Sequence, residues 1–282
     1  MQCSYLILFQ LYKKKSHYLK KKHTIGFVPT MGALHQGHLS LIQQAKKNTD
    51  IIVVSIFVNP TQFDNKEDLD NYPITLENDL KLLKSVGCDI VFTPSIKEIY
   101  ADTIRSKHFD FGSISHEMEG KFRNGHFDGV GTIVNRLFDI IQPDKAFFGE
   151  KDFQQLQIIK KLVEIENKNI EIIGCPIFRE LDGLAMSSRN ERLTPAYRKA
   201  APFIFEILQK VQQKFDIKNA VEITNWVKEM FDKHPILELE YFTIANESDL
   251  KTLTNEIQKN QTYRAFIAVF AGDIRLIDNI DL

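Results

Sequence analysis

The sequence predicts a parallel α/β sheet of the doubly wound, Rossmann-like kind, followed by a smaller α+β unit. Three observations support this fold class. In the first two-thirds of the chain, short runs rich in Val, Ile and Phe alternate with segments whose apolar residues recur at helical spacing. Polar motifs follow several of these runs, at the edge where the carboxyl ends of parallel strands would meet. Beyond Thr194 the rhythm changes to helical patterns followed by three strand-like runs.

Five apolar runs are expected to form the buried strands of the parallel sheet: Ile25–Val28, Ile51–Val58, Asp89–Phe92, Lys145–Phe148 and Ile170–Ile173. The helices that connect and follow them are expected at Leu39–Lys47, Thr75–Val86, Val130–Ile141 and Phe153–Ile165. The last of these helices carries the clearest apolar stripe. Such strand–helix alternation is typical of a doubly wound sheet.

The C-terminal third begins with a helix signal, because Thr194 is a good N-cap and Pro195 suits the first helical position. One long helix is expected from there to about Lys214, and a second at Ala220–Phe231. Strands are expected at Leu239–Ile244, Tyr263–Phe270 and Ile274–Ile277. We therefore predict two domains, a larger one at 1–185 and a smaller one at 186–282 that covers the site described below.

Composition excludes several classes of protein. The 282 residues are 43% hydrophobic, which is ample for a core, and 36 basic against 37 acidic residues give a net charge of −1. We therefore expect neither nucleic acid nor an anionic membrane as a partner. The run Tyr5–Phe9 is too short to span a membrane. Three distant cysteines without metal-ligand spacing indicate reduced thiols in a cytoplasmic protein. We assign no side chain as a metal ligand.

The most informative motif is His35-Gln-Gly-His38. A strand that stops at Pro29, a turn through Gly32 and a helix that starts near Gly37 would aim both imidazoles at a helix N-terminus. Free N–H groups and the helix dipole favour phosphate there. His38 could then donate a proton or a strong hydrogen bond to a leaving pyrophosphate, with His35 assisting. The structural alternative is a helix that merely begins with His.

Two further loops carry phosphate chemistry. Gly149–Asp152 repeats the order of strand, glycine turn and helix, and Lys151 is placed to reach a phosphate as a point charge. Met186–Arg189 offers two hydroxyls and a guanidinium to a triphosphate whose negative charge grows as it leaves.

These two loops also have a structural interpretation. Asp152 with Gln155, and Ser188 with Glu191, have the spacing of a capping box. Capping does not account for Ser187 or for the arginine that ends the second motif.

Two loops contribute amides and mixed donors. Asn59 and Gln62 follow the second strand, where a turn formed by Asn59-Pro60 is the structural alternative. Gln62 can orient a carboxylate or a hydroxyl without adding charge. The loop Arg123–Phe127 combines a guanidinium and an imidazole, and its alternative is a solvated turn.

Taken together, these motifs resemble a known family. His35–His38 resembles the HxGH element of the nucleotidyltransferase superfamily that includes class I aminoacyl-tRNA synthetases, and Met186–Arg189 resembles its KMSKS-type partner loop. The remaining motifs narrow the resemblance to the pantothenate synthetase (pantoate–β-alanine ligase) family over residues 24–282: Pro29–Gly32, Phe57–Pro60, Gly149–Asp152, Asp182–Asn190 and Asp273–Asn279.

This resemblance implies an AMP-forming ligase of the coenzyme A pathway. ATP would drive the condensation of (R)-pantoate with β-alanine to pantothenate, AMP and pyrophosphate through a pantoyl adenylate. No covalent bond to a side chain is needed, so catalysis would come from positioning and charge stabilisation. Mg²⁺ is expected mainly on the ATP phosphates. The family is usually dimeric, so the resemblance also implies a homodimer.

The resemblance also implies roles for individual residues. His38 is the proton donor to the leaving group, and His35, Lys151 and Arg189 share in catalysis. Gln62 would hold pantoate and lie against β-alanine, whereas Gln155 would either hold pantoate or cap its helix. The residues expected around ATP are Met31, Gly32, Ala33, Leu34, His35, Gln36, Gly37, His38, Gly149, Glu150, Lys151, Asp152, Phe178, Met186, Ser187, Ser188 and Arg189.

Three positions depart from the family pattern. Asn78 and Asp79 stand where an acidic pair is common, which leaves a protein ligand for Mg²⁺ open. Ile74 replaces a common Arg, and Asn124 replaces a proline, which removes a constraint on φ. Other functions weighed are adenylyl transfer to a phosphopantetheine-like acceptor on the same fold, an RNA-binding or synthetase-like role, and a non-catalytic nucleotide sensor.

Overall fold

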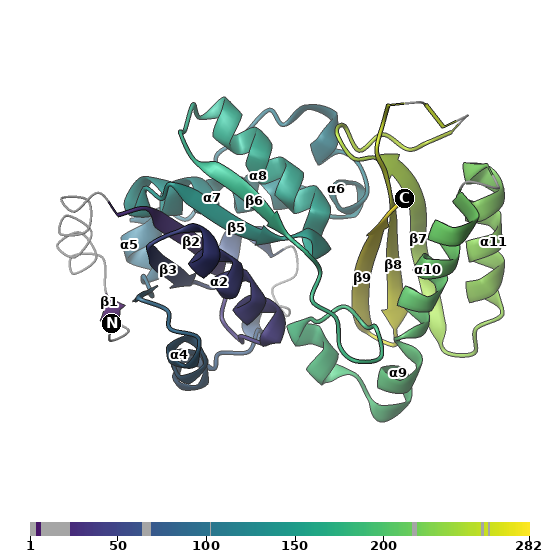
Figure 1. Cartoon of the computed structure of the whole chain (residues 1–282), viewed down its shortest axis with the longest axis horizontal. Coiled ribbons are helices and arrows are strands. Elements are labelled where there is room, and N and C mark those ends of the chain that lie inside the picture. The colour runs from purple at the N-terminus through teal and green to yellow at the C-terminus, as the bar shows by residue number, and fades with distance from the viewer. Residues whose placement is uncertain are drawn as a thin grey trace. The chain divides into compact units, whose positions relative to one another are not determined.

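The computed structural model of the chain describes residues 4–6, 23–63, 69–101, 103–215, 219–254, 257–258 and 260–282. The chain divides into two compact units (Figure 1). The N-terminal unit holds Met1–Glu150 and Gln155–Pro176, and the C-terminal unit holds Lys151–Gln154 and Ile177–Leu282. The division thus falls earlier than the predicted boundary at 185. That the smaller unit covers the active site stays a prediction.

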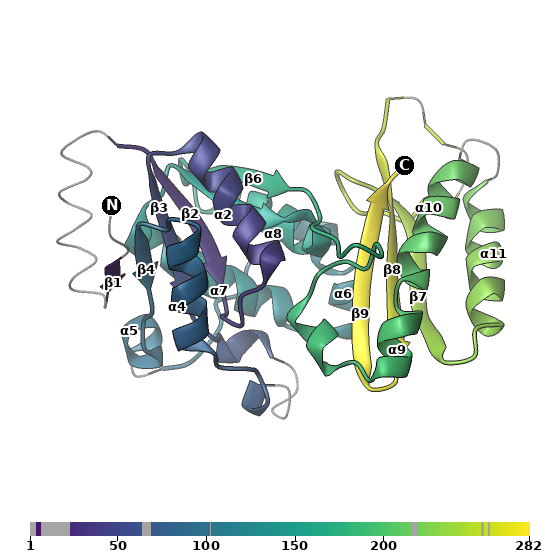
Figure 2. The same ribbon diagram turned by 60° about the horizontal axis from the view of Figure 1, so that its bottom comes forward.

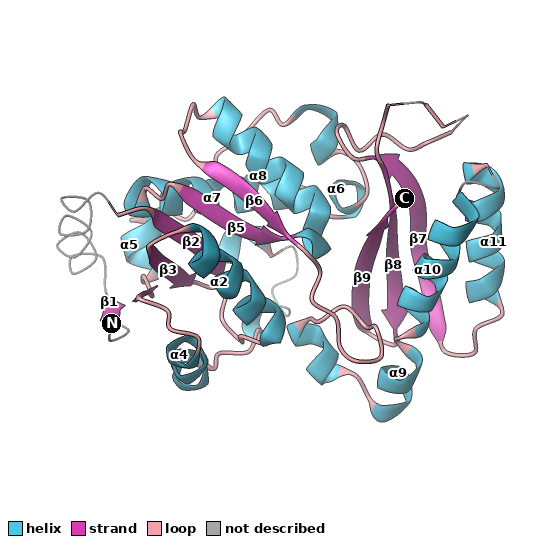
Figure 3. Cartoon of the chain, in the orientation of Figure 1, coloured by secondary structure: helices cyan, strands magenta, loops and turns pink. Residues whose placement is uncertain are grey.

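The N-terminal unit is built on one parallel sheet, shown by its strands in Figure 3. Its strands are β1 (Ser4–Leu6), β2 (Ile25–Thr30), β3 (Ile51–Ile56), β4 (Ile90–Phe92), β5 (Lys145–Gly149) and β6 (Glu171–Cys175). They lie in the order β1-β4-β3-β2-β5-β6. The chain runs outward from β2 to β4 and then returns to the other side of β2 for β5. This reversal confirms the predicted doubly wound sheet, and its topological switch point lies between β2 and β5.

Helices cover both faces of this sheet (Figure 2). They are α2 (Gln36–Asn48), α4 (Leu76–Ser85), α5 (Ile96–Tyr100), α6 (Glu119–Phe122), α7 (His126–Ile141) and α8 (Phe153–Ile165), with short 3-10 helices η1 (Pro60–Gln62), η2 (Gly112–Ser115) and η3 (Glu150–Asp152). Val28 of β2 packs in one cluster with Ile42 of α2 and Leu83 of α4. Phe27 points the other way, as alternation along a strand requires, and contacts Phe138 of α7.

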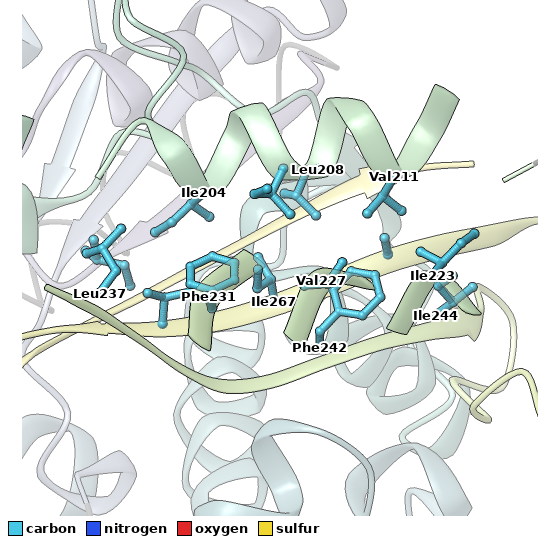
Figure 4. Close-up of a cluster of buried hydrophobic side chains, with 14 of the residues drawn as sticks. Ile204, Leu208, Val211, Ile223, Val227, Phe231, Leu237, Phe242, Ile244 and Ile267 are labelled. Atoms are coloured by element: carbon cyan, nitrogen blue, oxygen red, sulfur yellow. The ribbon is translucent and has the colours of Figure 1, made fainter. Parts of the chain in front are cut away.

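The C-terminal unit is a three-stranded antiparallel sheet with helices on one face (Figure 1). It contains η4 (Ser188–Arg192), α9 (Pro195–Ala200), α10 (Phe203–Phe215), α11 (Ala220–Asp232), β7 (Leu237–Asn246), β8 (Tyr263–Ala271) and β9 (Ile274–Asp281). Buried side chains such as Leu208, Val227 and Ile267 meet between α10, α11 and the strands, as Figure 4 shows. This core confirms the predicted α+β unit.

The predicted long helix from 195 to 214 is wrong, because the structure has two helices there. Thr194 caps α9 and Pro195 is its first residue, as predicted. The helix ends at Ala200, and α10 begins at Phe203. Pro202 lies between them and lacks the N–H that a continuous helix needs. The apolar stripe runs on across this break, which is why periodicity alone joined the two helices.

Other elements are longer or shorter than predicted. Strand β2 continues to Thr30 and β9 to Asp281, whereas β3 ends at Ile56 rather than Val58. Helix α7 begins at His126, four residues before the predicted start at Val130. Glycines weaken helical propensity in that first stretch, so the pattern there is ambiguous in sequence.

Within the described residues, no helix is both long and apolar enough to cross a membrane. Among those same residues, no group of three His, Cys, Asp or Glu side chains is arranged to hold a metal ion. Cys88 and Cys175 are buried, and Cys3 lies outside the described part of the chain. Burial, with a smaller contribution from Glu150, raises the pKa of the Cys175 thiol to about 11.

Candidate functional site

The motif His35–His38 lies between β2 and α2, in the predicted order of strand, turn and helix. His35 is the N-cap residue of α2, with an extended backbone. Its N–H donates to Nδ1 of His38 at 3.3 Å, and the two rings lie 4.0 Å apart between centroids. Because Nδ1 accepts this hydrogen bond, a neutral His38 carries its proton on Nε2. The half-buried imidazole therefore presents an N–H donor beside the helix N-terminus.

A buried carboxylate holds the turn before this motif. Gly32 and Ala33 both have positive φ, at 89° and 49°. Asp79 of α4, only 1% exposed, accepts from the N–H groups of Ala33 and Leu34 at 3.0 and 2.9 Å. Thr75 Oγ1 donates to the same carboxylate at 3.1 Å. Asp79 therefore fixes the backbone that leads into the histidines, and its oxygens already serve as acceptors there.

The loop after β3 brings Gln62 to the same turn. Asn59, 1% exposed, caps η1 by accepting from the N–H of Thr61, so the predicted Asn-Pro turn is present. Asn59 Nδ2 also donates to Gln62 Oε1 at 3.1 Å. Gln62 Nε2 lies 2.9 Å from Sδ of Met31, the residue that follows β2. The amide and the residues before the histidines therefore meet, as the parallel sheet predicts for loops after neighbouring strands.

The solvated-turn alternative for Arg123–Phe127 is wrong, since His126 and Phe127 are buried. Arg123 Nη2 donates to the backbone oxygen of Gln62 at 3.2 Å, and His126 Nδ1 lies 2.9 Å from it. Arg123 Nη1 lies 3.1 Å from His126 Nε2. A guanidinium can only donate, so Nε2 is the acceptor and Nδ1 carries the proton given to Gln62. This loop clamps the main chain of Gln62.

The second loop predicted to bind phosphate follows β5, the strand that pairs with β2 across the switch point. β5 ends at Gly149, η3 continues to Asp152, and α8 then presents Gln155 in its first turn. The predicted order of strand, turn and helix is therefore confirmed. Whether Asp152 and Gln155 form a cap stays a prediction.

Lys151 is fastened to the last strand of the C-terminal unit. Its carbonyl oxygen accepts from Nδ2 of Asn279 at 2.9 Å. Asn279 is 1% exposed, and its Oδ1 accepts from Arg264 at 2.7 Å. The Arg264 guanidinium stacks on Phe153, 4.2 Å from the ring centroid. These contacts fix the main chain of Lys151. The Nζ atom of Lys151 lies 3.8 Å from the Asp152 carboxylate.

The Met186–Arg189 motif follows a short hairpin of the C-terminal unit, in which Arg179 pairs with Ala185. Ser187 Oγ accepts from the N–H of Arg189 at 3.3 Å and caps η4. The predicted cap at Ser188 is therefore wrong by one residue, and capping does account for Ser187. Phe178 starts the hairpin: its side chain is 40% exposed, and its carbonyl accepts from the N–H of Met186 at 3.0 Å.

Ion pairs hold the hairpin that carries this motif. Arg198 donates to Glu180 and Asp182, each at 2.6 Å. Burial acts to raise the pKa of Asp182, but the hydrogen bonds from Arg198 and from the N–H of Leu184, together with the charge of Arg198, outweigh it and lower that pKa below its usual value. Arg179 pairs with the buried Asp278 at 2.6 Å and stacks on Phe205. Charged hydrogen bonds thus anchor the first arm of the hairpin and its turn.

Known proteins match this chain along almost its whole length. The family model described as pantoate-beta-alanine ligase matches residues 8–281. A pantothenate synthetase of Christiangramia forsetii is 56% identical over 260 residues, covering 92% of each chain, and one of Flavobacterium psychrophilum is 53% identical over 94% of each chain. The chain belongs to the pantoate–β-alanine ligase family.

Solved structures of this family have the same fold. The crystal structure of pantothenate synthetase from Thermus thermophilus has a TM-score of 0.90 and 35% identity, covering 100% of this chain and 99% of its own. A pantoate-beta-alanine ligase from Francisella tularensis, in complex with β-γ ATP and β-alanine, has a TM-score of 0.80 and 38% identity, with 100% and 97% covered.

Membership of the pantoate–β-alanine ligase family gives the reaction. The chain is a ligase that uses ATP to join pantoate to β-alanine, as the resemblance in sequence predicted. Two of the residues that depart from the family pattern lie on the surface, because Ile74 is 84% exposed and Asn124 is also exposed.

Four residues escaped sequence reasoning as parts of the site: Asp79 as a clamp of the turn, Tyr100 behind Asn59, and Arg264 with Asn279 behind Lys151. Each acts through a partner far away in sequence. Two of the four positions had a signal in the sequence, because Asp79 stands where the family commonly has an acidic pair and Asn279 ends the motif Asp273–Asn279.

Proposed function

We propose that the ligase reaction takes place beside His38 and Gln62, at the carboxyl edge of the parallel sheet. The observation that carries this proposal is the contact between Gln62 Nε2 and Met31 Sδ at 2.9 Å. It puts an amide donor next to the turn that leads into His35 and His38. A small carboxylate held by the amide would therefore lie beside a phosphate held at the N-terminus of α2.

In the first step, an oxygen of the pantoate carboxylate attacks the α-phosphorus of ATP. The new oxygen–phosphorus bond forms while the bond to pyrophosphate breaks. His38 donates from Nε2 to the departing pyrophosphate oxygen, where negative charge grows. His35 assists by holding Nδ1 of His38 through its backbone N–H.

In the second step, the amine of β-alanine attacks the acyl carbon of the pantoyl adenylate. The carbon–oxygen bond breaks, AMP leaves with its phosphate oxygen, and the amine gives up its proton as the amide forms. Gln62 would orient the pantoyl group next to the incoming amine. Gln155, half-buried at the start of α8, is the second pantoate ligand in this proposal.

ATP would be held by the two glycine turns and by the hairpin of the C-terminal unit. Met31–His38, Gly149–Asp152, Phe178 and Met186–Arg189 are the proposed contacts, with Lys151 and Arg189 countering the charge of the phosphates. We propose that Mg²⁺ reaches the site on the phosphate oxygens and waters that it prefers. The carboxylate oxygens of Asp79, which contact the turn before the histidines, already accept hydrogen bonds.

We make three further proposals. The resemblance to the family supports a homodimer and a smaller unit that covers the active site, and the cysteine pattern supports a location in the cytoplasm. Light scattering of the purified protein tests the dimer, and a single species with the mass of one chain would contradict it.

An omission assay tests the proposed reaction. AMP should form only when ATP, pantoate and β-alanine are all present. Exchange of labelled pyrophosphate into ATP should need pantoate and proceed without β-alanine. AMP turnover that continues unchanged when β-alanine is left out would contradict the ligase reaction, and adenylyl transfer to added phosphopantetheine would support the other reaction weighed for this fold.

A further inference from the structure

Tyr100, the last residue of α5, lies in a tight cage behind the amide loop. It is 2% exposed. Its ring packs near Phe57, with centroids 6.4 Å apart, and the Arg136 guanidinium lies 4.7 Å from its centroid. Arg136 is itself tied to the backbone oxygen of Ile99. The ring therefore has one available position, and its hydroxyl points to one place.

That hydroxyl donates to Oδ1 of Asn59 at 2.5 Å. Burial raises the pKa of Tyr100, so the hydroxyl keeps the proton that it donates. Thr61 contributes to the same arrangement, since its Oγ1 lies 2.9 Å from the Tyr100 hydroxyl and 3.1 Å from Asn59 Oδ1. The carbonyl end of the Asn59 amide is therefore held among donors.

Fixing one end of the Asn59 amide also fixes the other. Asn59 Nδ2 donates to Gln62 Oε1 at 3.1 Å and to the carbonyl of Gly129 at 3.2 Å. A flipped Asn59 would set its NH₂ group against the hydroxyl donors and its oxygen against two acceptors. Such a buried mismatch is costly, so the amide has one stable orientation.

The orientation of Asn59 determines what Gln62 can offer to a ligand. Because Gln62 Oε1 accepts from Asn59, its NH₂ group turns toward Met31, whose sulfur is a weak acceptor. The clamp of Arg123 and His126 holds the main chain at the same time. Gln62 is therefore presented as a donor, which suits a carboxylate or hydroxyl oxygen of a ligand.

We propose that Tyr100 is a positioning residue of the pantoate site, which acts through Asn59 to turn the NH₂ group of Gln62 toward the substrate. This inference rests on the proposed function, in which Gln62 binds pantoate. It goes beyond that function by assigning the direction of the Gln62 amide, and with it a preference for an acceptor group, to a tyrosine that does not touch the substrate.

The test is Tyr100→Phe, which removes only the hydroxyl. In the pyrophosphate-exchange reaction, the KM for pantoate should rise about tenfold, as for the loss of one hydrogen bond to a buried group, while the KM for ATP stays within about twofold. The competitor pantoamide, the primary amide of pantoate, should lose less affinity than pantoate does, because a released Gln62 can also turn its oxygen outward.

The matched control is Tyr263→Phe in the C-terminal unit. Tyr263 is 3% exposed, and its hydroxyl also bonds side-chain and backbone partners, at Gln261 and Gln258. This variant should keep the wild-type KM for pantoate. Thr61→Val provides a second test of the same arrangement, because it removes another donor to the Asn59 amide oxygen. It should also raise the KM for pantoate, by a smaller factor than Tyr100→Phe.

A double-mutant cycle separates positioning from general structural damage. If Tyr100 acts through Asn59, Tyr100→Phe should have no further effect on the pantoate KM in an Asn59→Ala background. Additive effects, or equal rises in the KM for pantoate and for ATP, would overturn the inference. Gln62→Ala distinguishes failure of the proposed function from failure of the inference. If Gln62→Ala leaves the KM for pantoate unchanged, the proposed function is contradicted. If Gln62→Ala raises that KM and Tyr100→Phe does not, only the inference is contradicted.

Discussion

A backbone contact sets the tautomer of His38. The N–H of His35 donates to Nδ1, so a neutral His38 carries its proton on Nε2. The same principle recurs at Gln62 and His126, where a neighbour's donor decides which atom is left to donate. At the scale of the residue, hydrogen bonds from neighbours therefore orient the amide and imidazole donors of the proposed site.

His38→Ala should lower kcat by roughly 10²–10³, the effect of losing one transition-state donor, with a smaller change in the KM for pantoate. The exposed His116 provides a control, since His116→Ala should leave kcat unchanged. Steady-state AMP release measures both variants. An unchanged kcat in His38→Ala would remove the proton-donor role.

Asp79→Asn should loosen the turn before the histidines, because an NH₂ group would then face the N–H of Ala33 or Leu34. The free energy of unfolding should fall by about 1–3 kcal/mol, and the KM for ATP should rise. Asn78→Asp, at the exposed neighbouring position, should change little. A changed Mg²⁺ dependence in Asp79→Asn, with unaltered stability in denaturant titration, would identify the carboxylate as a metal ligand instead.

Asn279→Ala should release the carbonyl of Lys151 and leave Arg264 without its amide acceptor. We expect kcat to fall about tenfold, less than for Lys151→Ala, since the ammonium group remains but is held less well. Paired kcat measurements on the two variants check this order. A wild-type kcat in Asn279→Ala would show that the contact does not position Lys151.

The elements bring these donors together through close backbone approaches. In α7, a Cβ built on Gly129 would lie 2.2 Å from the carbonyl oxygen of Thr61 in η1. The glycine therefore allows the helix to touch the amide loop, and its own carbonyl accepts from Asn59. At this scale a small residue in a helix, which looks unfavourable by propensity, is explained by packing.

Gly129→Ala should force α7 and η1 apart. The expected cost is about 1–3 kcal/mol of unfolding free energy, because the obstacle is backbone and cannot rotate away. The KM for pantoate should rise as Gln62 shifts. Asp139→Ala on the same helix, which breaks a surface ion pair with Lys168, should change stability by less than about 1 kcal/mol. Equal stability of the two variants would contradict the packing role of Gly129.

Across the whole molecule, the periodicity of apolar residues predicted the architecture. It did not predict hydrogen bonds between residues that are distant in sequence. The alternation of apolar runs and helical stripes predicted the sheet, its doubly wound order and the loops that carry His35–His38 and Lys151. Nothing in the local pattern pairs Asp79 with Leu34, 45 residues away, or Tyr100 with Asn59, 41 residues away. Such partners depend on which loops the fold brings together, and they are visible only once the strands are in register.

The attachment of Lys151 has the same origin. Glu150 is grouped with the N-terminal unit and Lys151 with the C-terminal unit, although they are adjacent in sequence. The strand–turn–helix pattern predicts that Lys151 lies in the turn before α8, whereas the attachment of Lys151 to Asn279 depends on β9, at the other end of the chain. The sequence therefore predicts which residues are chemically suited, and the fold determines what holds them.

Transfer of an isotope from pantoate to AMP tests the adenylate mechanism most directly. With ¹⁸O in the carboxylate of pantoate, attack on the α-phosphorus leaves the bridging oxygen on AMP when β-alanine displaces it. Mass spectrometry of the products should therefore find one ¹⁸O in the phosphate of AMP and none in pyrophosphate. Label in pyrophosphate, or AMP without label, would contradict a pantoyl adenylate formed beside His38 and Gln62.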